Sequence, residues 1–169
     1  NPKDAFAYHD RGVAYYNRHD FDRALADFDQ LTKLAEIAGG GGAADAQRGY
    51  DRSVGEINEP VKINPSYALA FNDRGIAFAA KGEIDNAIAD FNQAIRINPN
   101  YALAFYNRGN VYFEKQDYNR AIQNFDQAVR FEPKYALAFK DRGIAFNEKR
   151  DYARAIKDFD QAIQLEPQD

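Results

Sequence analysis

Apolar side chains recur every three or four residues along most of the chain, in segments that short polar stretches separate. In residues 102–135, one such stripe contains Phe105 and Tyr112, and a second contains Ala121 and Phe125. This spacing is typical of amphipathic helices, which have about 3.6 residues per turn. The pattern therefore predicts two helices in this segment, with a break between them.

The same pattern returns with a period of 34 residues. Four copies share it: residues 5–38, 68–101, 102–135 and 136–169. The last three align without gaps, whereas the first loses the match after Gln30. Residues 1–4 match the tail of a further unit, so we expect a segment of a longer array. Two helices cannot bury their apolar faces alone, so we expect the units to stack as one array.

Polar residues at the breaks predict where the helices begin. Asn64-Pro65 and Asn98-Pro99 suit the start of a first helix, since asparagine is a favoured N-cap and proline a favoured first residue. An acidic residue precedes each second helix, where it can cap the helix or stabilise its dipole. These acidic residues are Asp20, Glu83, Asp117 and Asp151.

Residues 39–67 form a shorter and irregular second unit. Their second half keeps the apolar stripe, but Pro60 and the consecutive glycines of 39–42 oppose a regular helix. Three interpretations of residues 39–60 stay open. The segment is a degenerate unit with a flexible loop and a kinked helix, a hinge that promotes self-association or domain swapping, or an altered, engineered linker.

The composition argues against several classes of function. Lys and Arg total 22 and Asp and Glu total 26, and the net charge of −4 argues against a nucleic-acid partner. The sequence has no cysteine, which excludes disulfides and thiolate sites. No apolar run approaches the length of about 20 residues that a membrane helix needs, so we expect no membrane partner.

The titratable residues lack the spacing of a catalytic or metal site. His9 and His19 do not form a metal-ligand pair, so no metal and no cofactor is expected. An aspartate recurs at one position of the second helices, interpreted here as outward-facing and solvated: Asp27, Asp90 and Asp158. At i,i+4 spacing, Arg154 would pair with Asp158, an arrangement typical of exposed helix surfaces. We therefore expect no enzyme.

An arginine precedes the glycine of each first helix. These residues are Arg11, Arg74, Arg108 and Arg142. We expect a structural role, in which the aliphatic stem covers apolar surface and the head group reaches a neighbouring aspartate or carbonyl group. Recognition of an anion is the alternative.

The unit resembles the tetratricopeptide repeat family. Its pattern of aromatic, small and proline residues falls, in the fourth unit, on Phe105, Arg108-Gly109, Tyr112, Ala121, Phe125, Ala128 and Pro133. Arginine stands where the family has leucine, a variant typical of bacterial arrays. The resemblance covers four units and implies an all-α fold, with tandem helix-turn-helix repeats stacked into a right-handed superhelical solenoid. It also implies a non-catalytic scaffold whose concave face, built by the first helices, binds a partner peptide.

By position, the resemblance assigns the lining of this concave face. The expected residues are Phe6, His9, Val13, Tyr16 and Asn17 from the first unit, Leu69, Asn72, Ile76 and Ala79 from the third, Leu103, Tyr106, Asn110, Phe113 and Glu114 from the fourth, and Leu137, Lys140, Ile144, Asn147 and Glu148 from the fifth. The alternative is that several of these apolar residues only pack between units.

The lining indicates the chemistry of the partner. Family members that bind chaperones hold a C-terminal carboxylate with lysine and asparagine, but only Asn110 fits that pattern here. We therefore expect no such clamp. Aromatic and aliphatic side chains with scattered amides favour a protein or peptide with apolar side chains, bound with little dependence on salt. The alternative is self-association, such as a homodimer formed through exposed repeat faces or the 39–60 segment.

Overall fold

The computed structural model describes residues 5–38 and 66–166. Within these residues the backbone forms helices and no strand. The helices are α1 (Ala5–Asn17), α2 (Phe21–Ala38), α4 (Ser66–Ala80), α5 (Ile84–Ile97), α6 (Ala102–Glu114), α7 (Tyr118–Phe131), α8 (Ala136–Glu148) and α9 (Tyr152–Leu165). The expected all-α fold is confirmed. The interpretations of residues 39–60 and of residues 1–4 lie outside the described residues.

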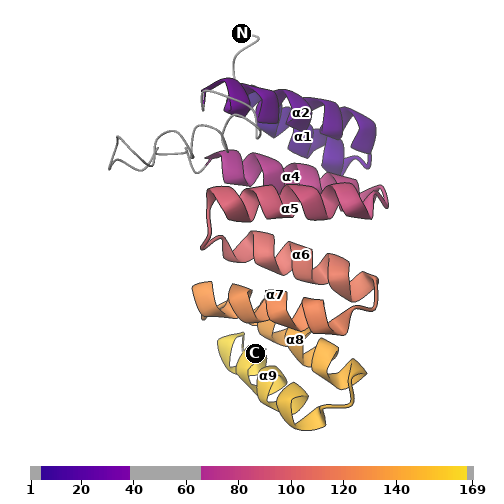
Figure 1. Cartoon of the computed structure of the whole chain (residues 1–169), viewed down its shortest axis with the longest axis vertical. Coiled ribbons are helices and arrows are strands. Elements are labelled where there is room, and N and C mark those ends of the chain that lie inside the picture. The colour runs from indigo at the N-terminus through magenta and orange to yellow at the C-terminus, as the bar shows by residue number, and fades with distance from the viewer. Residues whose placement is uncertain (1–4, 39–65, 167–169) are drawn as a thin grey trace, which may run out of the picture.

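Successive helices form pairs, and the pairs stack along the long axis of the molecule. Helices α1 and α2, α4 and α5, α6 and α7, and α8 and α9 pack within pairs. Between pairs, α2 packs on α4, α5 on α6, and α7 on α8. Figure 1 shows this order from α1 and α2 at one end to α9 at the other. The apolar stripes are buried within and between pairs, as the periodicity predicts.

A glycine and a phenylalanine bring the two helices of each pair together. A Cβ atom added at Gly109 would lie 2.6 Å from Cε1 of Phe125, which is closer than real side-chain contacts. The same pairing occurs at Gly143, where the distance to Cε1 of Phe159 would be 2.8 Å. Any side chain at these glycines would therefore push the helices apart. The small residue at this position therefore allows the two helices of a pair to pack closely.

A tight turn joins the helices of each pair. Its left-handed residues are His19, Gly82, Gln116 and Arg150, with φ of 60°, 80°, 59° and 62°. Only Gly82 adopts this conformation without the steric cost of a side chain. The N–H of Asp117 then donates to the carbonyl oxygen of Tyr112 at 2.9 Å and closes the turn before α7.

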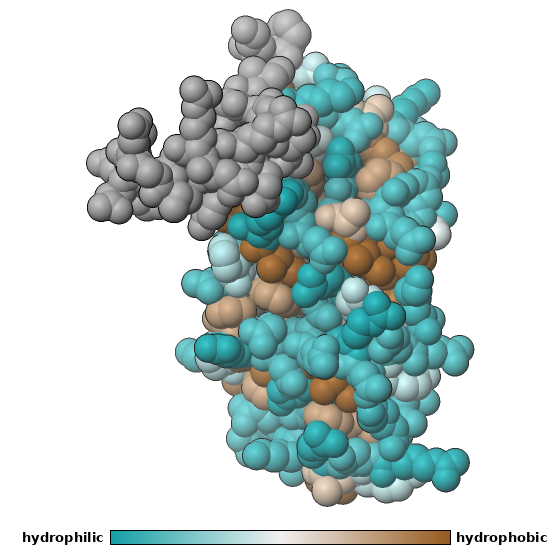
Figure 2. Space-filling view, in the orientation of Figure 1, coloured by the Kyte–Doolittle hydropathy of each residue, from teal (hydrophilic) through white to brown (hydrophobic). Residues whose placement is uncertain are grey.

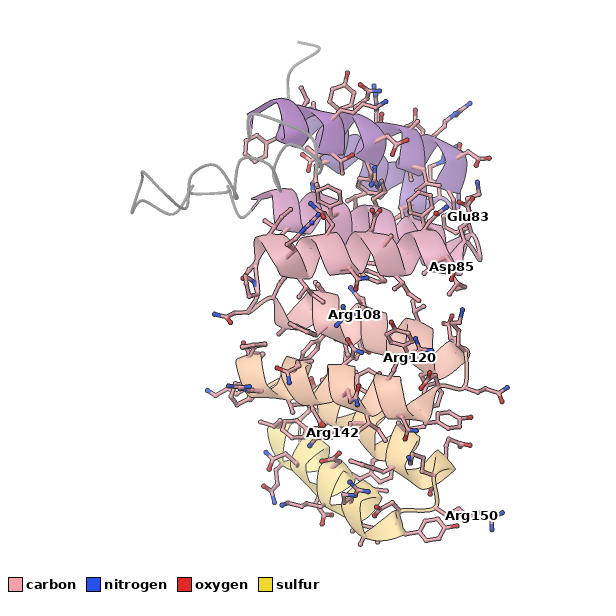
Figure 3. The ribbon with its side chains drawn as sticks, in the orientation of Figure 1. Glu83, Asp85, Arg108, Arg120, Arg142 and Arg150 are labelled. Carbon is pink, nitrogen blue, oxygen red and sulfur yellow. The ribbon has the colours of Figure 1, made fainter. Side chains whose placement is uncertain are left out.

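The expected caps of the second helices are confirmed for three of the four acidic residues. Asp20, Asp117 and Asp151 accept hydrogen bonds from backbone N–H groups three residues later, at 3.3, 3.0 and 3.2 Å. Glu83 makes no such cap. Its carboxylate binds the side chains of Lys81 and Asn86 instead, at the edge of the stack (Figure 3).

The expected start of the first helices is wrong where the structure describes it. Asn98 caps the C-terminus of α5, and α6 begins only at Ala102, after Tyr101. The carbonyl oxygen of Asn98 accepts a hydrogen bond from the N–H of Tyr101 at 3.1 Å. The Asn98-Pro99 segment therefore forms the turn between two units, because proline suits the residues after a helix as well as its first turn. For Asn64-Pro65 the expectation lies outside the described residues.

Candidate functional site

The residues assigned to the concave face all lie on the first helices of the pairs, α1, α4, α6 and α8. Leucines at one repeated position form an exposed row on three of these helices: Leu69, Leu103 and Leu137. Phe6 on α1 is the most exposed large apolar side chain of the described residues, at 80%. In the view of Figure 2, hydrophobic patches lie separated by hydrophilic surface. We call the surface of these four helices the first-helix face.

An open hollow of about 250 Å³ lies on this face between α6 and α8. Asn110, Phe113 and Glu114 line it from α6, and Asp141 and Ile144 line it from α8. The structure thus brings together four residues that the resemblance assigns to one surface. Its aromatic and aliphatic walls can hold an apolar side chain, and its amide can donate to or accept from a peptide backbone.

Tyr106 supports the wall of this hollow. Its hydroxyl donates to Oδ2 of Asp141 at 2.7 Å, and its ring centroid lies 4.8 Å from that of Tyr135. Burial raises the pKa of Tyr106 from its ordinary value to about 12. Tyr106 therefore acts more as a positioning group for Asp141 than as an open contact surface.

The expected place of Asn72 in the lining is wrong, because its side chain is buried. Its side chain is 0% exposed, accepts a hydrogen bond from Asn107 at 2.9 Å and donates to Asp73 at 3.2 Å. A peptide on the first-helix face cannot reach this amide. The side chain is buried because it links α4 to α6.

Asn72 belongs to a row of contacts between successive first helices, which we call the first-helix ladder. Its contacts are His9 Nε2 with Asp73 at 2.9 Å, Asn107 with Asn72 at 2.9 Å, and Tyr106 with Asp141 at 2.7 Å. Burial raises the pKa of Asp73, and hydrogen bonds from Asn72 and His9 oppose that rise. Asp141 is not among the residues expected from the sequence, although a polar residue follows the assigned position in every regular unit.

A second row of contacts, the arginine ladder, runs through the stack. Arg74 Nε and Nη2 bind both carboxylate oxygens of Asp90 at 2.7 Å. Its Nη1 reaches back to Asp29 on α2 at 2.8 Å. Arg142 repeats this geometry with Asp158 and with Asp126, each at 2.7 Å. Figure 3 shows Arg108 and Arg142 inside the stack at two successive levels.

The arginine ladder confirms the expected structural role of these arginines and corrects the interpretation of the aspartates. Asp27, Asp90 and Asp158 are buried, not outward-facing. Each forms a bidentate contact with the arginine that lies 16 residues earlier, on the other helix of its pair. The arginines that are closer in sequence, at i,i+4 spacing, do not pair with these aspartates. Arg154, for example, contacts Asp151 at the start of its helix.

The described residues hold no group of three or more His, Cys, Asp or Glu side chains that could bind a metal ion. Of the two acidic residues that line the hollow, Asp141 accepts a hydrogen bond from Tyr106 and Glu114 is exposed. No described helix has the length and apolar character needed to cross a membrane.

Sequence comparison gives the family of the chain. Models described as tetratricopeptide repeat match residues 5–36, 102–135 and 136–169, and a further model described as TPR repeat matches residues 75–116. The chain belongs to the tetratricopeptide repeat (TPR) family. Among curated proteins, none matches the sequence of this TPR array.

Solved structures with the same architecture are similar to this TPR array. A crystal structure of MamA aligns with a TM-score of 0.73 and 20% identity, over 98% of this chain and 80% of that one. The second TPR of Spaghetti (RPAP3), bound to the HSP90 peptide SRMEEVD, aligns with a TM-score of 0.60 and 30% identity, over 62% of this chain and 97% of that one. The Arabidopsis OM64 TPR domain aligns with a TM-score of 0.60 and 26% identity, over 63% and 88%. The likeness to MamA shows the fold alone.

Proposed function

We propose that this TPR array is a non-catalytic protein-interaction scaffold that binds a partner peptide on the concave face formed by α1, α4, α6 and α8. The hollow between α6 and α8 carries this proposal, because it joins an aromatic ring, an aliphatic side chain and an amide on one open surface. Membership of the family and the peptide bound by the second TPR of Spaghetti support the same function.

The partner segment has apolar side chains and is not acidic. Phe113 and Ile144 offer the hollow's apolar surface, while Asn110 can hydrogen-bond an extended backbone. Glu114 and Asp141 give the hollow a negative rim. The HSP90 peptide SRMEEVD has three acidic residues, and a negative rim disfavours such a ligand through repulsion between like charges.

A peptide array that varies apolar and acidic content tests this proposal. We expect the chain to retain apolar peptides and to leave SRMEEVD unbound. For the best apolar peptide, Phe113→Ala together with Ile144→Ala should weaken binding about tenfold or more, as measured by fluorescence anisotropy. Alanine already stands at the Phe113 position in α4, as Ala79, so the fold tolerates it there.

The matched control is Tyr152→Ala, which removes an exposed aromatic ring from α9, outside the proposed groove. It should leave the affinity unchanged. Binding of SRMEEVD as tight as that of the best apolar peptide would contradict the assigned ligand chemistry. An unchanged affinity in the double variant would contradict the assigned surface.

A second candidate function is self-association through exposed repeat faces. Three large apolar side chains of α9 favour it: Tyr152, Ile156 and Ile163 are 57%, 59% and 64% exposed. Side chains at the same positions of α5 and α7 are half-buried. A second copy of the chain could cover this face, in a homodimer or a larger assembly.

A further inference from the structure

Both ladders contain contacts that join one helix pair to the next, with one partner on each pair. In the arginine ladder, Nη1 of an arginine on a first helix donates to the preceding pair: Arg74 to Asp29, Arg108 to Asn92, and Arg142 to Asp126. In the first-helix ladder, Tyr106 of one pair donates to Asp141 of the next. Every regular pair therefore carries the same two half-contacts on each of its faces.

The arginine ladder leaves one half-contact open at each outer face of the described stack. Arg11 Nε and Nη2 bind Asp27 at 2.7 Å, but its Nη1 has no hydrogen-bond partner among the described residues. Asp160 on α9 stands at the position of Asp126 and is exposed. Among the described residues, the α1–α2 face thus presents an unpaired N–H donor of a guanidinium, and the α8–α9 face presents an unpaired carboxylate.

The first-helix ladder leaves a second pair of open half-contacts. Lys140 on α8 stands at the position of Tyr106, is exposed, and has no ion pair among the described residues. Asp10 on α1 stands at the position of Asp141. Among the described residues its carboxylate contacts only His9, and its side chain is 83% exposed. The charges of Lys140 and Asp10 are again opposite. Here the cation lies on the α8–α9 face and the carboxylate on the α1–α2 face, which is the reverse of the arginine ladder.

We propose that the chain stacks head to tail on a second copy of itself, with the α8–α9 face of one copy against the α1–α2 face of the next. In this arrangement Asp160 binds Nη1 of Arg11, and Lys140 binds Asp10, so both ladders continue across the junction. The proposal rests on self-association, the second candidate function, and adds its partner, polarity and contacts.

The apolar side chains of the two faces fit the same stacking. Within the stack, Ile122 of α7 packs on a cluster that contains Ala145, and Val129 packs on one that contains Ala138. Ile156 and Ile163 are their exposed counterparts on α9. On α1, Ala14 is exposed, whereas its counterparts Ala77, Val111 and Ala145 are buried. The junction would therefore bury the exposed apolar side chains of α9 against a small-residue surface.

Head-to-tail contacts join two different surfaces and leave one face of each kind open. The average mass should therefore keep rising with concentration, as measured by light scattering and sedimentation. A closed dimer would instead level off at twice the monomer mass.

Charge reversal at the first-helix ladder tests the polarity. In Lys140→Glu, the new glutamate would meet Asp10 of the next copy, and in Asp10→Lys, the new lysine would meet Lys140. Both junctions then bring like charges together, so each variant alone should associate about tenfold more weakly. An equimolar mixture of the two variants restores opposite charges at both kinds of junction. We expect the mixture to regain the mass of the unmodified chain.

Lys134→Glu is the matched control, because it makes the same charge change in the exposed turn before α8. It should leave the mass unchanged, and circular dichroism should show the same helix content in all variants. A mass that levels off at the dimer, with no effect of Asp10→Lys, would overturn head-to-tail stacking and leave self-association standing. A monomer at all concentrations would overturn both.

Discussion

Arg108 and Arg142 occupy the same position in two neighbouring helix pairs, but their partners differ in charge. Arg142 binds the carboxylates of Asp158 and Asp126. Arg108 binds the amide oxygens of Asn124 and Asn92. Both arginines are half-buried, and both complete the same two contacts, one within the pair and one to the preceding pair.

The electrostatic consequences are opposite. Burial disfavours the charge of Arg142, but hydrogen bonds and attraction from Asp158 and Asp126 outweigh burial and raise its pKa. Burial lowers the pKa of Arg108, because no carboxylate compensates for the lost water. Both arginines thus have a hydrogen-bond acceptor at each of these positions, and we expect the charge of the acceptor to set how much the contact stabilises the stack.

The largest expected effect comes from removing the acceptor within the pair. Asp158→Ala leaves the half-buried guanidinium of Arg142 with Asp126 alone and should lower the free energy of unfolding by about 3 kcal/mol. Asn124→Ala removes a neutral acceptor from Arg108 and should cost about 1.5 kcal/mol. Urea unfolding monitored by circular dichroism measures both.

Gln164→Ala is the control for this comparison, since it truncates an exposed polar side chain on the same helix as Asp158. It should change the free energy of unfolding by no more than about 0.5 kcal/mol. Equal losses for Asp158→Ala and Asn124→Ala would show that the charge of the acceptor contributes nothing.

The sequence predicts the repeat and the helix pairs because one pattern recurs and each copy supports the others. It also predicts the structural arginines, but assigns Asp158 to a solvated pair with Arg154. The i,i+4 rule considers a single helix, whereas the hairpin brings Arg142 closer, with a bidentate geometry. Local spacing could not predict this contact between helices.

The hollow is predictable in part for the same reason. Phe113 and Ile144 follow from the position of each residue in its repeat. Asp141 and the burial of Asn72 depend on contacts between successive first helices, which the pattern within one unit does not contain. The signal for the first-helix ladder is the pairing of polar residues 35 apart in sequence. Its contacts between consecutive regular units, Asn72 with Asn107 and Tyr106 with Asp141, both have this separation.

A second, smaller effect is expected from giving Arg108 the acceptor that Arg142 has. Asn124→Asp should raise the free energy of unfolding by about 1 kcal/mol, because the cation is already desolvated and gains a carboxylate. Loss of the hydrogen bond from Asn124 to the carbonyl oxygen of Arg120, 2.7 Å long, offsets part of the gain. The urea midpoint at neutral pH measures the difference.

Gln123→Glu makes the same change from neutral to anionic at an exposed site of α7 and should leave the midpoint nearly unchanged. A midpoint that falls in Asn124→Asp would mean that the cost of burying the carboxylate exceeds its attraction to Arg108. The difference between Arg108 and Arg142 would then reflect packing rather than charge.

The smallest effect is expected at the contact between pairs, where the acceptor is exposed. Asn92→Asp gives Arg108 a carboxylate partner, like the one that Arg142 has in Asp126. It should stabilise the stack by about 0.5 kcal/mol or less. Asp126→Asn, the reciprocal change, should remove a similar amount. Because both sites face solvent, the two shifts should shrink in about 1 M NaCl, where charges are screened beyond about 3 Å. Shifts in the urea midpoint that persist at this salt concentration would contradict the electrostatic origin, and would assign the effect to hydrogen-bond geometry at the junction.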